Sequence, residues 1–152
     1  MGWHALRVSE YFSNQAIRFF PAGLSVQETI EELIRLMDLP DPDTALKAVL
    51  AREETGPTIV APGLALPHAR LSGFPRIAAA VGICRDGIPS SSGEPIRLFI
   101  LFLSSKEKTR DHLMFLAAVS SLLQTEGLTA AILQSPTSEA VLEKIREAER
   151  AL

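Results

Sequence analysis

Hydrophobic residues recur at helical spacing in four segments of the chain. The predicted helices cover about Ser25–Met37, Asp41–Glu54, Asp111–Gln124 and Ser135–Ala148. The first has an S-x-x-E capping box made by Ser25 and Glu28. The second and fourth begin with a capping residue followed by proline, at Pro42 and Pro136, and Gly56 with the next proline must end the second.

The middle third of the chain has a different pattern. Arg76–Cys84 and Ile96–Leu103 are nearly continuous apolar runs bounded by turn residues, and Gly63–His68 is a short apolar segment interrupted by proline. Strands without polar alternation indicate a sheet covered by helices on both faces. The pattern therefore predicts an α/β fold, with a small mixed β-sheet sandwiched between helices, in a single domain over residues 1–152.

Composition narrows the classes of function. The chain has 152 residues, 47% of them hydrophobic and 22% charged, and a net charge of −3, values typical of a globular domain. Basic residues are scattered, which argues against nucleic-acid binding, and no apolar run is long enough for a membrane span. The start of the chain has no export-signal pattern and Cys84 is the single cysteine, so we expect a protein of the cytoplasm that is not embedded in a membrane.

Several common site types have no sequence support. The chain contains neither a P-loop nor a G-x-G-x-x-G turn, and it lacks H-E-x-x-H, paired C-x-x-C and G-x-S-x-G motifs. Three histidines and one cysteine make a weak zinc set. We expect no cofactor and no metal.

The chemistry centres on His68. Pro67 forces Leu66 into an extended conformation, so we expect His68 to stand at the end of a strand, where functional groups gather in α/β folds. A histidine with an unperturbed pKa near 6.5 is mostly neutral in the cytoplasm, and neutral imidazole is a good nucleophile. If one ring nitrogen donates to a carbonyl, the other is fixed as the attacking lone pair.

A phosphoryl group on His68 would need nearby donors. Arg52 offers a planar fork of N–H groups, His112 lies at the predicted start of a helix, and Thr58 and Ser104 are candidate hydroxyl donors. Each also has a plain structural interpretation: Arg52 as the partner of a helix-face glutamate, His112 as a surface or capping residue. Arg70 is most simply interpreted as a solvated loop residue.

The stretch Gly63–Leu71 resembles the signature of type-2 enzyme IIA domains of the bacterial phosphoenolpyruvate-dependent phosphotransferase system. The similarity extends to Arg52, Glu53 and Thr58 upstream, and to Leu98–Ser104 and Asp111–Leu113 downstream. The resemblance implies that His68 matches the phosphorylated histidine of that family, His112 its second active-site histidine, and Arg52 its active-site arginine. Around Ile59–Pro62 the chain departs from the family pattern, which predicts a stiffer and more apolar loop.

The resemblance also implies the partners. A phosphorylated histidine carrier protein (HPr or NPr) would donate the phosphoryl group, with no metal or nucleotide. The recipient would be a cysteine on a IIB domain during sugar uptake, or the phosphorylation state would act as a signal to a regulatory target protein, as in nitrogen-type IIA proteins. A third hypothesis is a sensory or docking domain that is not phosphorylated. The joint presence of Arg52, His68 and His112 argues against it.

Overall fold

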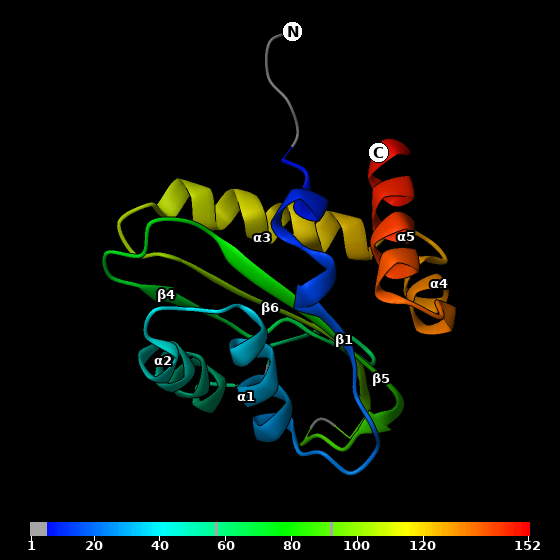
Figure 1. Cartoon of the computed structure of the whole chain (residues 1–152), viewed down its shortest axis with the longest axis horizontal. Helices are drawn as coiled ribbons and strands as arrows, with labels where there is room; N and C mark the ends of the chain where they lie inside the picture. The colour runs from blue at the N-terminus through cyan, green and yellow to red at the C-terminus, as the bar shows by residue number, and fades with distance from the viewer. Residues whose placement is uncertain (1–5, 57, 92) are drawn as a thin grey trace, which may run out of the picture.

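A mixed β-sheet runs through the protein (Figure 1). The computed structural model describes residues 6–56, 58–91 and 93–152. Within these ranges the sheet has six strands. They are β1 (Ile17–Phe19), β2 (Ile59–Ala61), β3 (Leu64–Ala65), β4 (His68–Leu71), β5 (Ala78–Ile88) and β6 (Ile96–Ser105).

The two long strands β5 and β6 form the centre of the sheet. They pair antiparallel, with Val81 opposite Ile100. On its other edge β6 pairs parallel with β3 and then with β4, where His68 lies opposite Phe102. β1 adds to β5 in parallel and β2 adds to β3 antiparallel. The predicted mixed sheet is thus confirmed.

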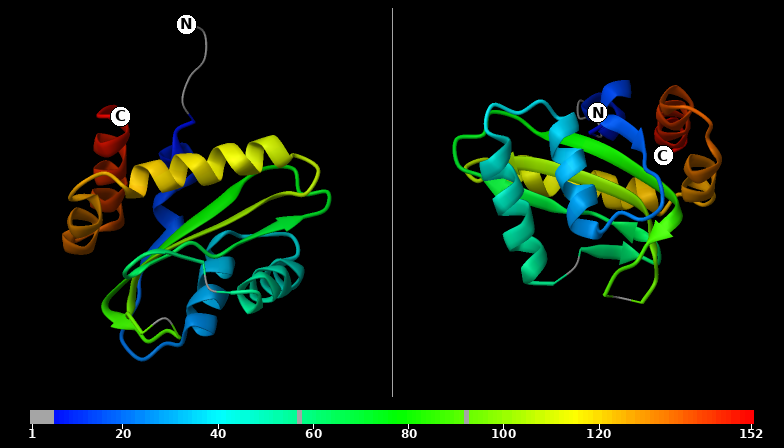
Figure 2. Two further views of the ribbon diagram at one scale, coloured as in Figure 1. Left: turned by 180° about the vertical axis from the view of Figure 1, so that it is seen from behind. Right: turned by 60° about the horizontal axis from the view of Figure 1, so that its bottom comes forward.

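Helices cover both faces of the sheet (Figures 1 and 2). One face carries α1 and α2, and the other carries α3, α4 and α5. The helices are α1 (Val26–Leu36), α2 (Pro42–Glu54), α3 (Thr109–Leu123), α4 (Leu128–Gln134) and α5 (Ser138–Arg150), with 3-10 turns at Val8–Tyr11 and Asn14–Ala16. The predicted sandwich architecture is confirmed.

Alternation along β6 divides the hydrophobic core into two layers. Successive strand residues point to opposite faces. Leu98, Ile100 and Phe102 pack with α3 and α5, whereas Phe99, Leu101 and Leu103 pack with α1 and α2. Burial on both faces explains why this strand is apolar at nearly every position.

Helix starts were predicted with mixed success. The capping box at Ser25 and Glu28 is confirmed, with both reciprocal hydrogen bonds at 3.0 Å. The predicted start of the last helix was wrong. Thr137 caps α5 through a bond from the Ala140 amide, while Ser135 ends the preceding helix α4. The pattern did not distinguish α4 from a loop because it is only two turns long.

The predicted position of His68 was also wrong in one respect. β3 and β4 both pair with β6, and Pro67 lies in the break between them. The chain pairs with β6 again from His68 onward, so His68 begins a strand instead of ending one.

The longest described helix, α3, has 15 residues, fewer than the roughly 20 that cross a membrane. None of the described helices is by itself long and apolar enough to cross a membrane. α3 and α4 taken together are as long and as apolar as a membrane span, but the chain bends by 81° between them.

Gly82 of β5 lies close to Leu33 of α1, with little room for a side chain. A Cβ there would lie 2.9 Å from Phe20 Cε2 and 3.2 Å from Leu33 Cδ2. We predict that Gly82→Val lowers the free energy of unfolding by about 1–3 kcal/mol, because overpacking forces neighbouring side chains off their rotamers. Urea unfolding measures this change. Ala51→Val also introduces a valine, but on the exposed side of α2, and should cost only about 0.5 kcal/mol. Equal losses in both variants would contradict the packing account.

Candidate functional site

The His68 ring is fixed by one hydrogen bond and one stacking contact. Its Nδ1 lies 2.8 Å from the Leu66 carbonyl oxygen. Because a carbonyl can only accept, Nδ1 carries the hydrogen and Nε2 carries the lone pair. The ring lies flat against Phe102, with centroids 5.1 Å apart and planes within 7°. His68 therefore presents a defined nucleophilic nitrogen in a defined orientation.

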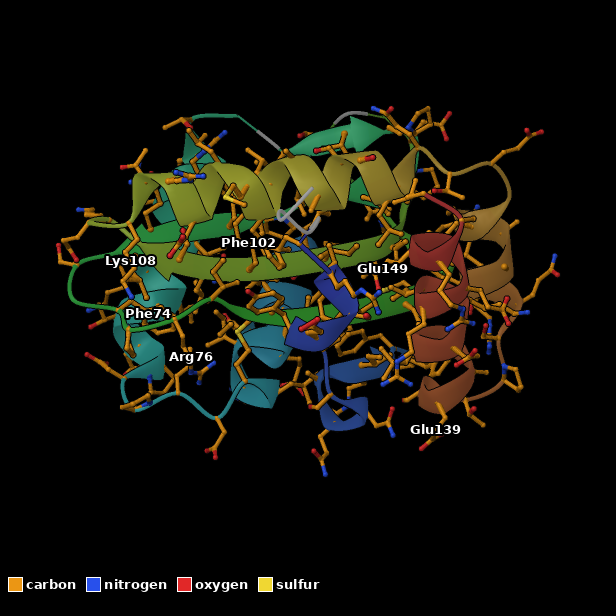
Figure 3. All side chains as sticks on the ribbon, turned by 90° about the horizontal axis from the view of Figure 1, so that it is seen from above. Phe74, Arg76, Phe102, Lys108, Glu139 and Glu149 are labelled. Carbon is orange, nitrogen blue, oxygen red and sulfur yellow. The ribbon has the colours of Figure 1, made fainter. Side chains whose placement is uncertain are left out.

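His112 reaches the same place from the first turns of α3. The ring is buried, with 7% of the residue exposed, and its Nδ1 lies 2.6 Å from Ser104 Oγ. Its centroid lies 5.6 Å from that of His68 and 5.5 Å from that of Phe102. Phe102 in turn packs on Phe115 of α3, and Figure 3, viewed from the α3 side, labels Phe102 beside that helix. The two histidine rings thus lie side by side, and both contact the ring of Phe102.

Both histidine rings favour the neutral state. Burial is the main cause that lowers the pKa of His68, and the nearby charge of Arg52 lowers it further, against opposing effects of the Leu66 bond and Glu53. Burial also lowers the pKa of His112, and the charges of His68 and Arg70 act in the same direction. Each pKa therefore lies below the ordinary value of 6.5. A neutral ring keeps the lone pair that a nucleophile needs.

Arg52 lies at the end of α2, near the His68 ring. Its Nη1 donates to Thr55 Oγ1 at 2.8 Å and to the Gly56 carbonyl at 3.3 Å. The residue is exposed, and within the described residues its partners are these two groups and not a helix-face glutamate, so the simple ion-pair interpretation was wrong. Both acceptors are neutral, and the positive charge of Arg52 lowers the pKa of His68.

The two predicted hydroxyl donors already have partners. Thr58 Oγ1 donates to Glu53 Oε2 at 2.8 Å. Ser104 is fully buried, and its hydroxyl bonds His112. The structure therefore brings Ser104 to the site through His112, and it brings Thr58 there through Glu53.

Arg70 was interpreted wrongly from the sequence. It lies within β4, half-buried, and its Nη2 donates to the Lys106 carbonyl at 2.8 Å and to Thr109 Oγ1 at 2.6 Å. Two-residue alternation from His68 would have placed it on the face of His112, but the pattern did not extend a strand beyond His68. Phe102 was also missed, since only the register of β4 with β6 places it against His68. The carbonyl that fixes the His68 ring belongs to Leu66, two residues before it.

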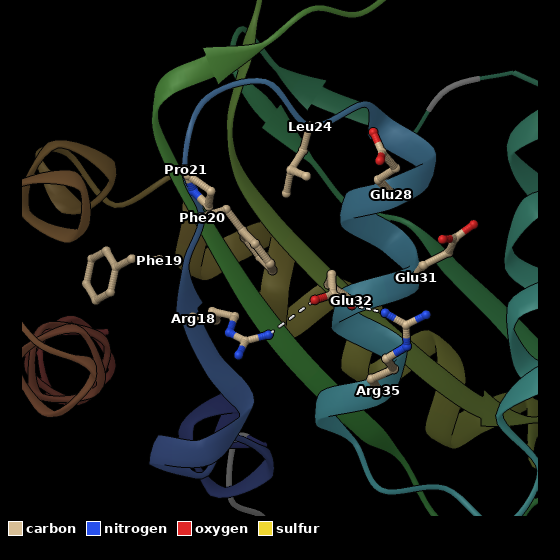
Figure 4. Close-up of a pocket in the computed structure, with 9 residues that line it drawn as sticks. All are labelled: Arg18, Phe19, Phe20, Pro21, Leu24, Glu28, Glu31, Glu32 and Arg35. Carbon is tan, nitrogen blue, oxygen red and sulfur yellow. Dashed lines mark hydrogen bonds and ion pairs between the residues drawn. The ribbon is translucent and has the colours of Figure 1, made fainter.

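A separate hollow of about 440 Å³ lies beside α1, away from the histidines (Figure 4). Its side chains include Phe20 and Leu24, and Glu32 forms ion pairs with Arg18 and Arg35. It offers no nucleophile. Among the described residues, no group of three histidine, cysteine or acidic side chains is placed to hold a metal ion.

Comparison with known proteins identifies the class to which this arrangement belongs. In structure the chain is similar to the nitrogen regulatory protein IIA-Ntr of Neisseria meningitidis, with a TM-score of 0.79, 21% identity, and 91% of this chain and 98% of that chain covered. The profile described as "Phosphoenolpyruvate-dependent sugar phosphotransferase system, EIIA 2" matches residues 10–148. The chain belongs to this family.

Curated relatives carry two kinds of name. The chain is 24% identical to the fructose-specific EIIABC component of Bacillus subtilis over 93% of its own length but only 23% of that protein. It is 29% identical to the nitrogen regulatory protein of Pseudomonas aeruginosa over 78% of its own length and 81% of that protein. The chain thus spans less than a quarter of the fructose component and most of the nitrogen regulatory protein.

The lowered histidine pKa values predict how stability changes with pH. Between pH 8 and 5.5 the free energy of unfolding should fall as the pH drops below about 6.5. In this range the two histidines bind protons more readily in the unfolded chain than in the folded protein, where their pKa values are lowered. Urea unfolding across this range measures it. His112→Gln should flatten the dependence. Constant or rising stability toward pH 5.5 would contradict the neutral assignment.

Proposed function

We propose that this chain is a phosphohistidine carrier of the phosphotransferase system, which accepts a phosphoryl group on His68 from a phosphorylated histidine carrier protein (HPr or NPr). The observation that carries the proposal is the bond from His68 Nδ1 to the Leu66 carbonyl, since it leaves Nε2 as the single attacking nitrogen. Membership of the EIIA family supports it. The protein would act as a phosphotransferase in the cytoplasm.

The transfer is a displacement at phosphorus. The Nε2 lone pair forms the new N–P bond while the N–P bond of the donor breaks, and the donor ring keeps that electron pair. The His68 ring then bears a positive charge that is shared with Nδ1–H. The Leu66 carbonyl, 2.8 Å from Nδ1, stabilises this charge by accepting the hydrogen bond.

The neighbouring groups would stabilise the phosphoryl oxygens. His112 faces the His68 ring at 5.6 Å between centroids, and Arg52 supplies an exposed guanidinium at the end of α2. Both are donors suited to an anionic group. Ser104 would act by holding the His112 ring, and Thr58 by holding Glu53. Little covalent work is asked of the protein, so positioning and charge carry the catalysis.

The phosphoryl group would leave His68 by the same kind of displacement. A cysteine thiolate of a IIB domain attacks phosphorus, the N–P bond breaks, and the electron pair returns to Nε2. The name of the fructose-specific EIIABC relative supports this recipient. The nitrogen regulatory relatives support a second use, in which phosphorylation of His68 alters binding to a target protein.

Phosphorylation of the purified protein tests the proposal. With phosphoenolpyruvate, enzyme I and the histidine carrier protein, we predict acid-labile, alkali-stable phosphate on His68 and none on His68→Ala. Circular dichroism of the variant checks that it is folded. Label that persists in His68→Ala would contradict the site, and no label on the native protein with cognate partners would favour a docking domain without phosphorylation.

Two further variants test the roles of His112 and Arg52 in the same assay, with Arg35→Ala as the control. His112→Ala and Arg52→Ala should still label at His68, but more slowly, because each donor supplies about 2–4 kcal/mol of transition-state stabilisation. Arg35→Ala removes an exposed arginine of α1 that pairs with Glu32 and should label at the native rate. Native rates in both site variants would contradict their roles.

A further inference from the structure

Arg70 connects the strand of His68 with the start of the helix of His112. It lies two residues after His68 in β4, so both side chains leave the same face of the sheet. In the register of β4 with β6, Arg70 is opposite Ser104, the residue whose hydroxyl bonds His112. Arg70 is therefore next to both histidines, and although it lies within the signature stretch Gly63–Leu71, the resemblance assigned it no role.

The guanidinium anchors the first turn of α3. Its Nη2 donates to the Lys106 carbonyl at 2.8 Å and to Thr109 Oγ1 at 2.6 Å. The N-cap residue Lys108 makes no side-chain cap, so this helix starts without the usual capping bond. Arg70 does not replace that cap, because a guanidinium only donates, but its bonds to Lys106 and Thr109 tie the start of the helix to β4.

Three further hydrogen bonds join the loop after β4 to the loop before α3. The Lys106 amide donates to the Leu71 carbonyl at 3.0 Å, the Gly73 amide to Glu107 Oε1 at 2.7 Å, and Lys108 Nζ to the Pro75 carbonyl at 3.2 Å. Figure 3 shows the ends of these loops close together, where Lys108 and Phe74 are labelled. Among these contacts Arg70 is the one that directs a charge toward His112.

We infer that Arg70 is a positioning residue of the phosphoryl-transfer site, which fixes the first turn of α3 and sets His112 against His68. The inference rests on the proposed function. Arg70 acts through His112 and its helix. It is a separate role from that of Arg52, which approaches His68 from α2 with an exposed guanidinium.

The charge of Arg70 also contributes to the lowered pKa of His112. Burial lowers the pKa of His112, and the charges facing the ring come from His68 and Arg70 of β4. Ser104 and Phe102 of β6 and Phe115 of α3 are uncharged, and Arg110 and Asp111 of α3 are exposed. In the neutral tautomer that accepts the Ser104 hydroxyl on Nδ1, His112 would keep Nε2–H as a donor for a phosphoryl oxygen.

The hydrogen bonding of Arg70 is incomplete in the described part of the chain. Its Nε is buried there without a hydrogen-bond partner. An unsatisfied buried donor is a cost to stability, and such groups in native structures call for an explanation. A role of Arg70 in the site would explain why this unsatisfied donor is present despite its cost to stability.

Titration of the His112 ring by NMR, with transfer kinetics from the phosphorylated histidine carrier protein, tests the inference. Arg70→Gln should raise the pKa of His112 toward 6.5 and slow transfer at least tenfold, with little change in the KM for the donor. Arg70→Lys keeps the charge, so the His112 pKa should stay low, but it loses the planar fork, and transfer should still slow. Thr109→Val removes one acceptor and should slow transfer less.

Arg76→Gln is the matched control. It removes one positive charge from the loop after β4, where Arg76 lies over the Phe74 ring, and it should change neither readout. The inference is overturned if Arg70→Gln matches Arg76→Gln in both measurements while His68 is phosphorylated at the native rate. The NMR titration needs no phosphoryl donor, so a native protein that is never labelled would overturn the proposed function separately.

Discussion

The hydrogen bond between His68 Nδ1 and the Leu66 carbonyl is the constraint on which the site depends. It exists because Pro67 separates two short strands: Leu66 donates its amide to the Thr58 carbonyl, and the Pro67 carbonyl accepts from Phe102. The Leu66 carbonyl is thereby placed 2.8 Å from the ring two residues on. A local break in the sheet thus defines the tautomer of the nucleophile.

The rest of the fold supports that ring. β6 provides Phe102 below it and Ser104 beside its partner His112, and alternation along this strand directs both to the α3 face. Burial in this layer disfavours protonation of both imidazoles. A site lined by neutral rings, with Arg52 at its edge, is suited to receive a dianionic group and to release it again.

Much of this architecture could be predicted from the sequence because its signals are local. The cap at Ser25, the proline at the start of α2, and the apolar runs of β5 and β6 each depend on a few neighbouring residues. The short strands β1, β2 and β4 and the two-turn helix α4 are stabilised mainly by pairing and packing with distant segments. Their sequences alone carry no such signal.

The same distinction applies to the candidate site. His68, His112 and Arg52 were predicted as site residues from residue type and family resemblance, and their proposed roles rest on chemistry that the sequence displays. Ser104 was expected to face phosphate, yet it is fully buried against His112. Arg70 was not considered for the site because its place beside His112 follows from the strand register, which sets it opposite Ser104. Residue type indicates what a group can do, while only the fold determines which group it acts on.

The most direct test of this account is the position of phosphorus on the His68 ring. Nitrogen-15 and phosphorus-31 NMR of the phosphorylated protein distinguishes the two ring nitrogens. We predict an N–P bond at Nε2, with Nδ1 still protonated and bonded to the Leu66 carbonyl. Phosphorus on Nδ1 would contradict it, because that nitrogen is the one the Leu66 carbonyl holds.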